Sequence, residues 1–376
     1  MLRNFFKQLD YVQLLAVCLL LGCGLIFIRS TGIQVDTELS RSFFPRQICW
    51  IMLGMVAYWF FAVLDYRTIG FKFGTLVFYL FSLVLLVYVL FFGRKVFGAT
   101  RWINFFGFRL QPSEPAKLAV IAMLAWLYAA RGVQQRLVQT LLISIGVTTV
   151  PFLLIVIEPD LGSALILLPI YLVMIFCAGL KWRYILAIVL LAAAAAAVLC
   201  TDYLREDPLL LREYQRDRIR TFLNPGSDKS NLGHNAYQAK LAVGSGGFAG
   251  KGIGEGTQNE LGFLPQTVSN NDFIFSVIAE ETGFSGVLLL LGMYILLLYS
   301  MLRTAFLAPE YGRMLAVGSA ALIFCHVFIN IGMSVGLAPV TGLPLPLVSY
   351  GGSFIISMMS VLGVMQSIYR HREMAA

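Results

Sequence analysis

Residues 73–93 read FGTLVFYLFSLVLLVYVLFFG and contain no charged side chain. A helix of about 20 apolar residues is long enough to cross the roughly 30 Å hydrocarbon core of a bilayer. The rest of the chain has a similar character, because 59% of its 376 residues are hydrophobic, only 13% are charged, and the mean hydropathy is +0.79. Soluble domains carry about 25% charged residues. The composition therefore excludes an ordinary soluble enzyme and predicts a protein that crosses the membrane several times.

The same length rule divides the chain into ten apolar segments, which predicts an all-α, polytopic integral membrane protein with about ten transmembrane helices. The segments are 11–29, 47–64, 73–93, 115–130, 138–157, 162–179, 184–201, 273–300, 314–335 and 351–369. An even number of spans places both termini on one side. A polar stretch at about 202–272 is expected to form one large extracytoplasmic loop. We treat 1–376 as a single membrane domain.

The distribution of basic residues favours cytoplasmic termini. Each of the six short segments on the side of the termini carries two Lys or Arg, and short loops rich in these residues stay in the cytoplasm. The net charge of +8 does not indicate nucleic-acid binding, because the basic residues lie between apolar runs and not on a solvated domain. The remaining basic residues gather mainly in two outer loops, 94–117 and 202–272, which are candidates for binding an anionic group.

The first of these loops, GATRWINFFGFRLQPSEPAK (98–117), places Arg101 and Arg109 next to the start of the fourth segment. Glu114 lies in the first turn of that segment, and Lys117 follows three residues later on the same face. Ionisable groups at membrane depth usually face a partner or a cavity. Two interpretations stand: an ion pair between Glu114 and Lys117 that only closes the helix, or a cationic pocket for an anionic head group.

Two further outer segments carry candidate groups. In IEPDLGSA, Glu158 and Asp160 could share a metal ion, or Asp160 could cap the next helix. The Gly-rich run GSGGFAGKGIGEG (244–256) lacks the Walker A spacing and a βαβ context. It therefore predicts a flexible loop whose backbone can approach a ligand closely.

The strongest single candidate is Asp272, at the junction between the large loop and the eighth segment. A carboxylate at the membrane face can have a raised pKa and act as a general base, although Asp is also a favoured helix cap. Glu280 lies two turns further along on a similar face, as a buried acid.

Nearer the C-terminus, GLAPVTGLPLPLVSYGGS (336–353) is expected to line the same outer cavity. His326 and Asn330 are expected to form hydrogen bonds between helices.

Six ordered motifs carry a family resemblance: RWI…QPSEPAK, EPDLG, RIRTFLNP, YQAKLAVGSGGFAGKGIGEGTQ, FLP…DFIFSVIAEETG and PVTGLPLPLVSYGGS. With these motifs the chain resembles the SEDS (shape, elongation, division, sporulation) family of bacterial cell-wall proteins over nearly its whole length. The short tails and the ending MQSIYRHREM are similar to the elongation-type, RodA-like branch.

The resemblance implies an inverting peptidoglycan glycosyltransferase that polymerises lipid II, the undecaprenyl-pyrophosphate-linked disaccharide-peptide, during cell elongation. The active site would face the extracytoplasmic side of the bacterial cytoplasmic (inner) membrane. The implied partners are a class B penicillin-binding protein, which is a transpeptidase, and other membrane proteins of the elongation complex. No organic cofactor is implied, and a divalent cation, Mg²⁺ or Mn²⁺, is a candidate for neutralising the pyrophosphate.

The family's essential acid is the Asp that precedes FIF, which is Asp272 in this chain, so the resemblance favours the base over the cap. The chain departs from the common FLPE-x-H-T-D pattern, because it reads FLPQTVSNND, with Gln266 in place of Glu and no His. The resemblance assigns the pyrophosphate to basic groups of the two outer loops, namely Arg101, Arg109, Lys117, Arg218 and Arg220. Further substrate-binding candidates are Glu114, Glu158, Asp160, Gln258, Glu280 and Ser349.

Two other functions fit a ten-span protein with a charged cavity. A lipid II flippase would need a site that opens to both faces of the membrane, whereas the polar groups concentrate on the outer side. A non-catalytic scaffold of the elongation complex would tolerate removal of the cavity charges.

Overall fold

The computed structural model describes residues 7–34, 38–69, 72–96, 99–105, 108–131, 137–203, 213–223 and 232–372. A helix forms at each of the ten predicted segments. These helices are α2 (Tyr11–Gln34), α3 (Glu38–Val63), α5 (Lys72–Phe92), α6 (Ser113–Arg131), α7 (Leu137–Ile157), α8 (Leu161–Cys177), α9 (Trp182–Tyr203), α14 (Ile274–Leu307), α15 (Glu310–Ser334) and α16 (Gly352–Arg370). Within the described residues, seven of them are long and apolar enough to cross a membrane. The other three fall short, because α6 carries charged side chains and the apolar parts of α8 and α9 are shorter.

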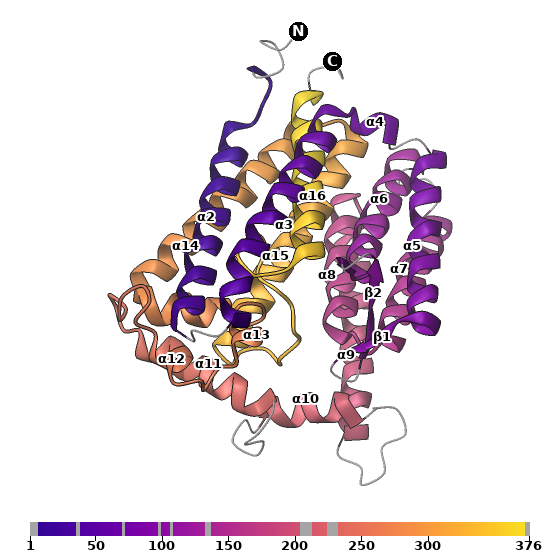
Figure 1. Cartoon of the computed structure of the whole chain (residues 1–376). Helices are drawn as coiled ribbons and strands as arrows, with labels where there is room; N and C mark the ends of the chain where they lie inside the picture. Colours follow the sequence, from indigo (N-terminus) through magenta and orange to yellow (C-terminus); the bar gives the residue numbers. More distant parts are fainter. Residues whose placement is uncertain are drawn as a thin grey trace.

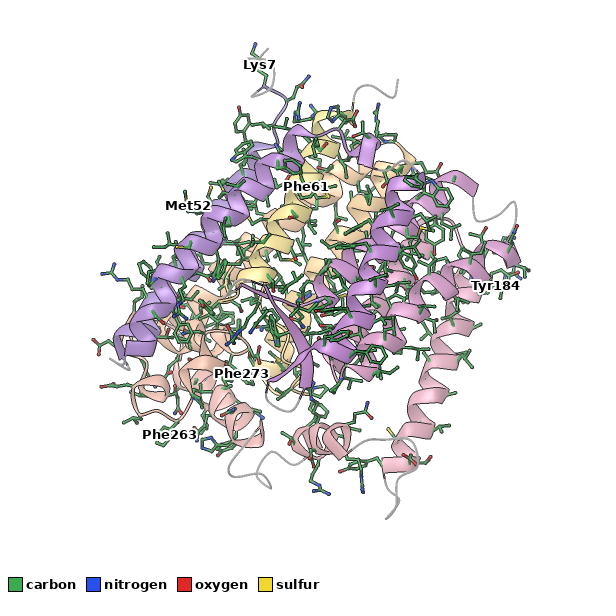
Figure 2. All side chains as sticks on the ribbon, turned by 45° about the vertical axis from the view of Figure 1, so that its right-hand side comes forward. Lys7, Met52, Phe61, Tyr184, Phe263 and Phe273 are labelled. Carbon is green, nitrogen blue, oxygen red and sulfur yellow. The ribbon has the colours of Figure 1, made fainter. Side chains whose placement is uncertain are left out.

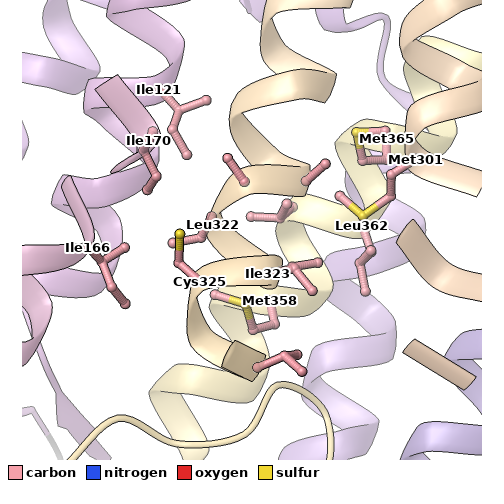
Figure 3. Close-up of a cluster of buried hydrophobic side chains, with 14 of the residues drawn as sticks. Ile121, Ile166, Ile170, Met301, Leu322, Ile323, Cys325, Met358, Leu362 and Met365 are labelled. Carbon is pink, nitrogen blue, oxygen red and sulfur yellow. The ribbon is translucent and has the colours of Figure 1, made fainter. Parts of the chain in front are cut away.

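The apolar helices pack around α15, which contacts α6, α8 and α14, while α16 lies along α3. The core between them is built from aliphatic and methionine side chains, as Figure 3 shows for Ile121, Ile166, Ile170, Leu322, Ile323, Met358, Leu362 and Met365. α15 and α16 are the most buried of the long helices, with 72% and 67% of their most apolar windows enclosed by protein. Segments from both halves of the sequence therefore form one core.

Figure 1 shows both termini at one end of the bundle and the short helices of the large loop at the other. In Figure 2, Lys7 lies at the end opposite Phe263 in the same way. The loop helices are α10 (Glu213–Leu223), α11 (Leu232–Ser245), α12 (Thr257–Glu260) and α13 (Gln266–Ser269), and α4 (Tyr66–Ile69) lies near the termini. The prediction that both termini share one side is confirmed. We call the end with α10 to α13 the outer end.

The first outer loop contains a feature that was not predicted, a small antiparallel sheet in the order β1-β2-β3. Its strands are β1 (Arg94–Val96), β2 (Ala99–Phe105) and β3 (Phe108–Leu110). Ile103 pairs with Leu110 and Asn104 with Arg109. Aromatic and β-branched residues in ATRWINF suit a pleated, half-buried strand. The membrane part is helical as predicted, while this sheet fixes the position of the loop that carries Arg101.

The eighth segment is not one continuous helix, because α14 is broken at Gly283, where φ is 65° and ψ is −164°. The Gly-rich loop packs against this break. A Cβ at Gly250 would lie 2.2 Å from the carbonyl oxygen of Glu281, and a Cβ at Gly283 would lie 2.3 Å from the backbone nitrogen of Gly250. Only glycine allows two backbones to approach so closely. In the structure two glycines of this run, Gly246 and Gly250, lie against the backbone of α14, and the expected approach of the loop to a ligand stays a prediction.

Candidate active site

Asp160 is the centre of a polar cluster at the outer ends of α6 and α8. It is the N-cap of α8, and its Oδ1 accepts a hydrogen bond from the backbone nitrogen of Ser163 at 3.3 Å. Its Oδ2 accepts from Gln111 Nε2 at 2.7 Å and from the Ser113 hydroxyl at 3.4 Å. Arg101 of β2 approaches Oδ1 at 3.6 Å. The predicted cap is confirmed, and the same carboxylate also holds the arginine of the sheet in place.

Glu158 precedes this cap and is almost completely buried, with 1% of its surface exposed. Its Oε1 has no hydrogen-bond partner within the described part of the chain. Burial, together with the negative charge of Asp160, raises the pKa of Glu158 to about 9, although Arg101 acts in the opposite direction. Glu158 is therefore protonated at neutral pH and adds no charge to the cluster.

Asp272 lies just before α14, and it is not the helix cap that its position suggested. The N-cap of α14 is Phe273, which makes no side-chain cap hydrogen bond. The Asp272 carboxylate instead lies over Gly342, since a Cβ at that glycine would be 3.5 Å from Oδ2. Gly342 has a φ of +74°, which glycine adopts without strain. The carboxylate is thus free of capping and faces the loop 336–350.

The environment of Asp272 changes its acidity in the direction that a general base requires. Asp272 is partly buried, and desolvation raises its pKa to about 6, against the opposing effects of Arg218 and Arg101 and with a smaller contribution from Asp160. These charges come from α10, β2 and the α7–α8 turn. Charged groups from three of the predicted outer regions therefore influence one carboxylate.

Arg218 and Arg220, both predicted to bind the pyrophosphate, lie in different surroundings. Arg218 donates to the carbonyl oxygen of Thr341, the residue before Gly342, at 3.3 Å, and its positive charge lowers the pKa of Asp272. The Arg220 side chain is 59% exposed and lies 3.9 Å from Asp217 on the same helix. Residues two apart on a helix point in different directions. Arg220 is consequently outside the cluster.

Lys117 and Glu114 form a fully buried pair. The Lys117 ammonium lies 2.9 Å from Glu114 Oε1 and 3.0 Å from Nε2 of His326, and the side chain has no exposed surface. Nδ1 of His326 lies 3.2 Å from the carbonyl oxygen of Pro344. If the histidine is neutral, Nδ1 carries the proton and Nε2 accepts from the lysine. The hydrogen bond between helices expected of His326 is confirmed by its contact with Lys117 of α6, and His326 in addition joins the ion pair to the loop 336–350.

Four other predicted residues take different places. Arg109 on β3 is exposed and pairs with Asn104. Glu280 accepts hydrogen bonds from Lys251 Nζ at 2.5 Å and from the backbone nitrogen of Gln258 at 3.2 Å, so it binds the Gly-rich loop. Ser349 is buried and donates to the carbonyl oxygen of Asn271 at 2.6 Å. Glu280, Gln258 and Ser349 thus contact protein groups around the cluster and support its walls.

A cavity of about 850 Å³ lies beside this cluster, between α10, α11 and the loop that follows α15. Its walls are mostly apolar and include Phe222, Tyr237, Lys240 and Val340. Asp272, Arg101 and Asp160 do not line it. It is therefore a neighbouring compartment and not the polar cluster itself.

Residues 11–374 match the sequence model of the FtsW/RodA/SpoVE family, described as cell cycle proteins. The chain belongs to this family. It is 42% identical over 297 residues to the peptidoglycan glycosyltransferase MrdB of Escherichia coli K12, covering 79% of this chain and 78% of that protein. It is 31% identical to the peptidoglycan glycosyltransferase RodA of Treponema pallidum, covering 96% and 98%. It is 34% identical to stage V sporulation protein E of Bacillus subtilis, covering 96% and 97%.

Solved structures of the FtsW/RodA/SpoVE type have the same fold. One is a peptidoglycan synthase complex in which polymerization and crosslinking are coordinated, with a TM-score of 0.81 and 28% identity over 97% of this chain and 98% of that chain. Another is the crystal structure of the rod shape determining protein RodA of Thermus thermophilus, with a TM-score of 0.69 at the same identity and coverage. The family predicted from the motifs is confirmed, and the chain is a multi-pass membrane protein.

The polar cluster around Asp160 offers a metal ion few free carboxylate oxygens. Among the residues that the structure describes, no three or more His, Cys, Asp or Glu side chains are arranged to hold one. Both oxygens of Asp160 already have protein partners, and Glu158 has a raised pKa that disfavours the metal-binding form. The described side chains therefore do not fit a metal cage made by the protein alone.

Proposed function

We propose that this chain is a peptidoglycan glycosyltransferase that polymerises lipid II during cell elongation. Its family and the names of its relatives support the activity. The observation that carries the proposed site is that Arg218 and the Asp272 carboxylate meet adjacent residues of one loop, Thr341 and Gly342, while Arg101, held by Asp160, also lowers the pKa of Asp272. We further propose that the protein resides in the bacterial cytoplasmic membrane and that this end faces the extracytoplasmic side.

In the proposed reaction, Asp272 removes the proton from the 4-hydroxyl of the acceptor GlcNAc. The oxygen attacks C1 of the donor MurNAc, and the bond from C1 to the pyrophosphate oxygen breaks with inversion. Undecaprenyl pyrophosphate leaves with two negatively charged phosphoryl groups. Arg101 and Arg218 stabilise this charge. Such electrostatic stabilisation is strongest where water is excluded. Neutral Glu158 can donate a hydrogen bond but does not repel the leaving group.

Two parts of the proposal concern components outside the chain. A relative's structure couples polymerization to crosslinking, so we propose a class B penicillin-binding protein as partner, together with other membrane proteins of the elongation complex. A divalent cation would be held mainly by the substrate's pyrophosphate, and no step above depends on it.

The test is incubation of the purified protein with labelled lipid II, with and without a class B penicillin-binding protein and with and without EDTA. Glycan chains resolved on a gel are expected. If the protein in liposomes moves lipid II across the bilayer but forms no glycan under any of these conditions, the flippase interpretation replaces this one.

The two neighbouring arginines of α10 provide a matched test of the leaving-group site. Arg218→Ala removes a charge that faces Asp272, and we expect kcat/KM to fall about 10- to 100-fold, as for loss of a charged hydrogen bond. Arg220→Ala removes an exposed charge and is expected to stay within about twofold of wild type. Equal losses for the two variants, measured as glycan formed from lipid II, would contradict the inward assignment of Arg218.

The pKa of Asp272 predicts the pH dependence of the reaction. A general base acts only when deprotonated, so kcat/KM should be constant above about pH 6 and fall about tenfold per pH unit below it. An ordinary Asp, with a pKa near 3.9, would give no fall until about pH 4. Initial rates measured from about pH 4.5 to 8 distinguish the two cases.

A further inference from the structure

Three consecutive backbone carbonyls before α14 are held from the C-terminal part of the chain. The donors are the backbone nitrogen of Tyr350 to Asn270 O at 2.9 Å, the hydroxyl of Ser349 to Asn271 O at 2.6 Å, and Nδ2 of Asn330 to Asp272 O at 2.8 Å. No helical hydrogen-bond pattern supplies these contacts, because the segment precedes the helix. The backbone of the proposed base is therefore oriented by residues that follow it in the chain by 58 positions or more.

Asn330 also contacts the backbone of the loop 336–350. Its Nδ2 also donates to the carbonyl oxygen of Leu343 at 2.7 Å. A carboxamide nitrogen has two N–H groups, so both are used. Leu343 follows Gly342, the residue beneath the Asp272 carboxylate. The Asn330 side chain thus binds the backbone of Asp272 and, at Leu343, the backbone of the loop beneath the Asp272 carboxylate.

The burial of Asn330 makes these two hydrogen bonds hard to replace. The side chain has no exposed surface and projects from α15, the helix most enclosed by the bundle. Without the carboxamide, the carbonyl groups of Asp272 and Leu343 would lose this hydrogen-bond donor in the protein interior. Leaving a buried polar group unpaired is unfavourable, so the segment before α14 and the loop 336–350 would move apart or admit water.

We propose that Asn330 is a positioning residue for the transfer reaction, holding Asp272 and the loop 336–350 in one fixed relation so that the carboxylate faces the acceptor hydroxyl. The inference rests on the proposed function, with Asp272 as the base. Asn330 itself does not touch the reacting atoms. Its effect is geometric, and misplacement of a reacting group by about 1 Å can lower a rate about 100-fold.

The pKa of Asp272 depends on its burial and on the charged groups around it, so a change in its position should shift the pH profile of the reaction. These charged groups are Arg218 from α10, Arg101 from β2 and Asp160 before α8. A carboxylate released by loss of Asn330 would gain water, and water lowers the pKa of a carboxyl group that burial has raised. The acid limb of the rate profile would therefore move to lower pH.

The central experiment compares three replacements of Asn330 in the full-length protein. Asn330→Leu keeps the approximate volume and removes both donors, and we expect kcat to fall about 100-fold while KM stays within about threefold. Asn330→Asp places oxygen against two carbonyls and should be at least as impaired. Asn330→Gln keeps both donors on a longer side chain and should recover part of the activity lost in Asn330→Leu. Ser334→Ala is the control, since that hydroxyl only donates to the Asn330 carbonyl within the same helix.

A readout that does not need turnover separates positioning from loss of folding. Carbodiimides modify protonated buried carboxyl groups, so the pH at which the Asp272 peptide is half labelled can be followed by mass spectrometry. We expect a midpoint near pH 6 in the wild type and in Ser334→Ala, and a lower midpoint in Asn330→Leu.

Three outcomes decide between the proposals. If Asp272→Asn is active in the same assay, the proposed base is wrong, and this inference with it. If Asp272→Asn is inactive while Asn330→Leu keeps wild-type kcat and midpoint, only the positioning role is overturned. A merely structural role would lower thermal stability and kcat without shifting the acid side of the pH profile or the labelling midpoint, and Asn330→Gln would be no more active than Asn330→Leu. That result would also overturn the positioning role.

Discussion

Replacement of Asp272 by Asn is expected to reduce lipid II polymerisation by about 10²- to 10⁴-fold, the usual contribution of a general base. The change keeps the shape of the side chain and removes only its ability to accept a proton. The N-cap of α14 is Phe273, so the substitution removes no cap, and the helix should form as before. The measurement is the initial rate of glycan synthesis by purified protein, with the protein amount and thermal midpoint determined in parallel.

Asp217→Asn is the matched control, because Asp217 also lies in the large outer loop and its side chain is 56% exposed. Its rate should remain within about twofold of wild type, as expected for a surface ion pair. A folded Asp272→Asn protein that polymerises lipid II at the wild-type rate would exclude Asp272 as the base. The site would then have to be sought among the other carboxyl groups.

Hydropathy was sufficient to predict the ten long helices of the bundle, because a bilayer of fixed thickness selects apolar runs of one length. The segment 138–157 was predicted within one residue of α7, and 73–93 within one residue of α5. The break at Gly283 could not be seen in this way. The break depends on contacts with the backbone of Gly250, and the hydropathy of a segment gives no information about contacts with a distant segment.

Only part of the candidate site could be predicted, because some of its residues have partners that are distant in the sequence. Asp272 and Asp160 were found because polar residues at the ends of apolar runs are conspicuous. Gln111 and Asn330 were not assigned to the site, because their partners lie 49 and 58 residues away and no periodicity indicates such contacts. The separation of Arg218 from Arg220 could have been predicted, since a helical period places residues two apart on different faces.

The buried pair of Glu114 and Lys117 allows its two interpretations to be separated by a double-mutant cycle. Lys117→Met leaves Glu114 without its cation in a buried site, and we expect the free energy of unfolding to fall by about 3–5 kcal/mol. Glu114→Gln leaves Lys117 with His326 as its remaining partner among the described residues and should also destabilise. The double variant Glu114→Gln with Lys117→Met removes both charges, and its stability should return close to that of the wild type, because replacing a whole buried pair is often neutral.

Activity of the double variant decides what the pair is for. If the pair only closes the start of α6, polymerisation should recover together with stability. We expect it to remain at least about tenfold below wild type, because the pair, through His326, also holds the loop 336–350 on which the Asp272 carboxylate lies. Two atoms point to this outcome: Oε2 of Glu114 is buried without a hydrogen-bond partner among the described residues, and the two hydrogen bonds found for the Lys117 ammonium leave its third N–H available. A structural ion pair would be expected to satisfy both.

The pair Glu310 and Arg313 supplies a control with the same spacing of three residues at the opposite end of the bundle. Its side chains are 56% and 47% exposed, and the charged atoms are 3.7 Å apart. Glu310→Gln with Arg313→Met should change stability by less than about 1 kcal/mol and leave polymerisation unchanged. Because the spacing and the signs of the charges are matched, we attribute a loss confined to the Glu114 and Lys117 variants to burial and to position at the outer end. Full recovery of polymerisation in their double variant would instead assign this pair to helix closure and leave Arg101 and Arg218 as the cations proposed to bind the pyrophosphate.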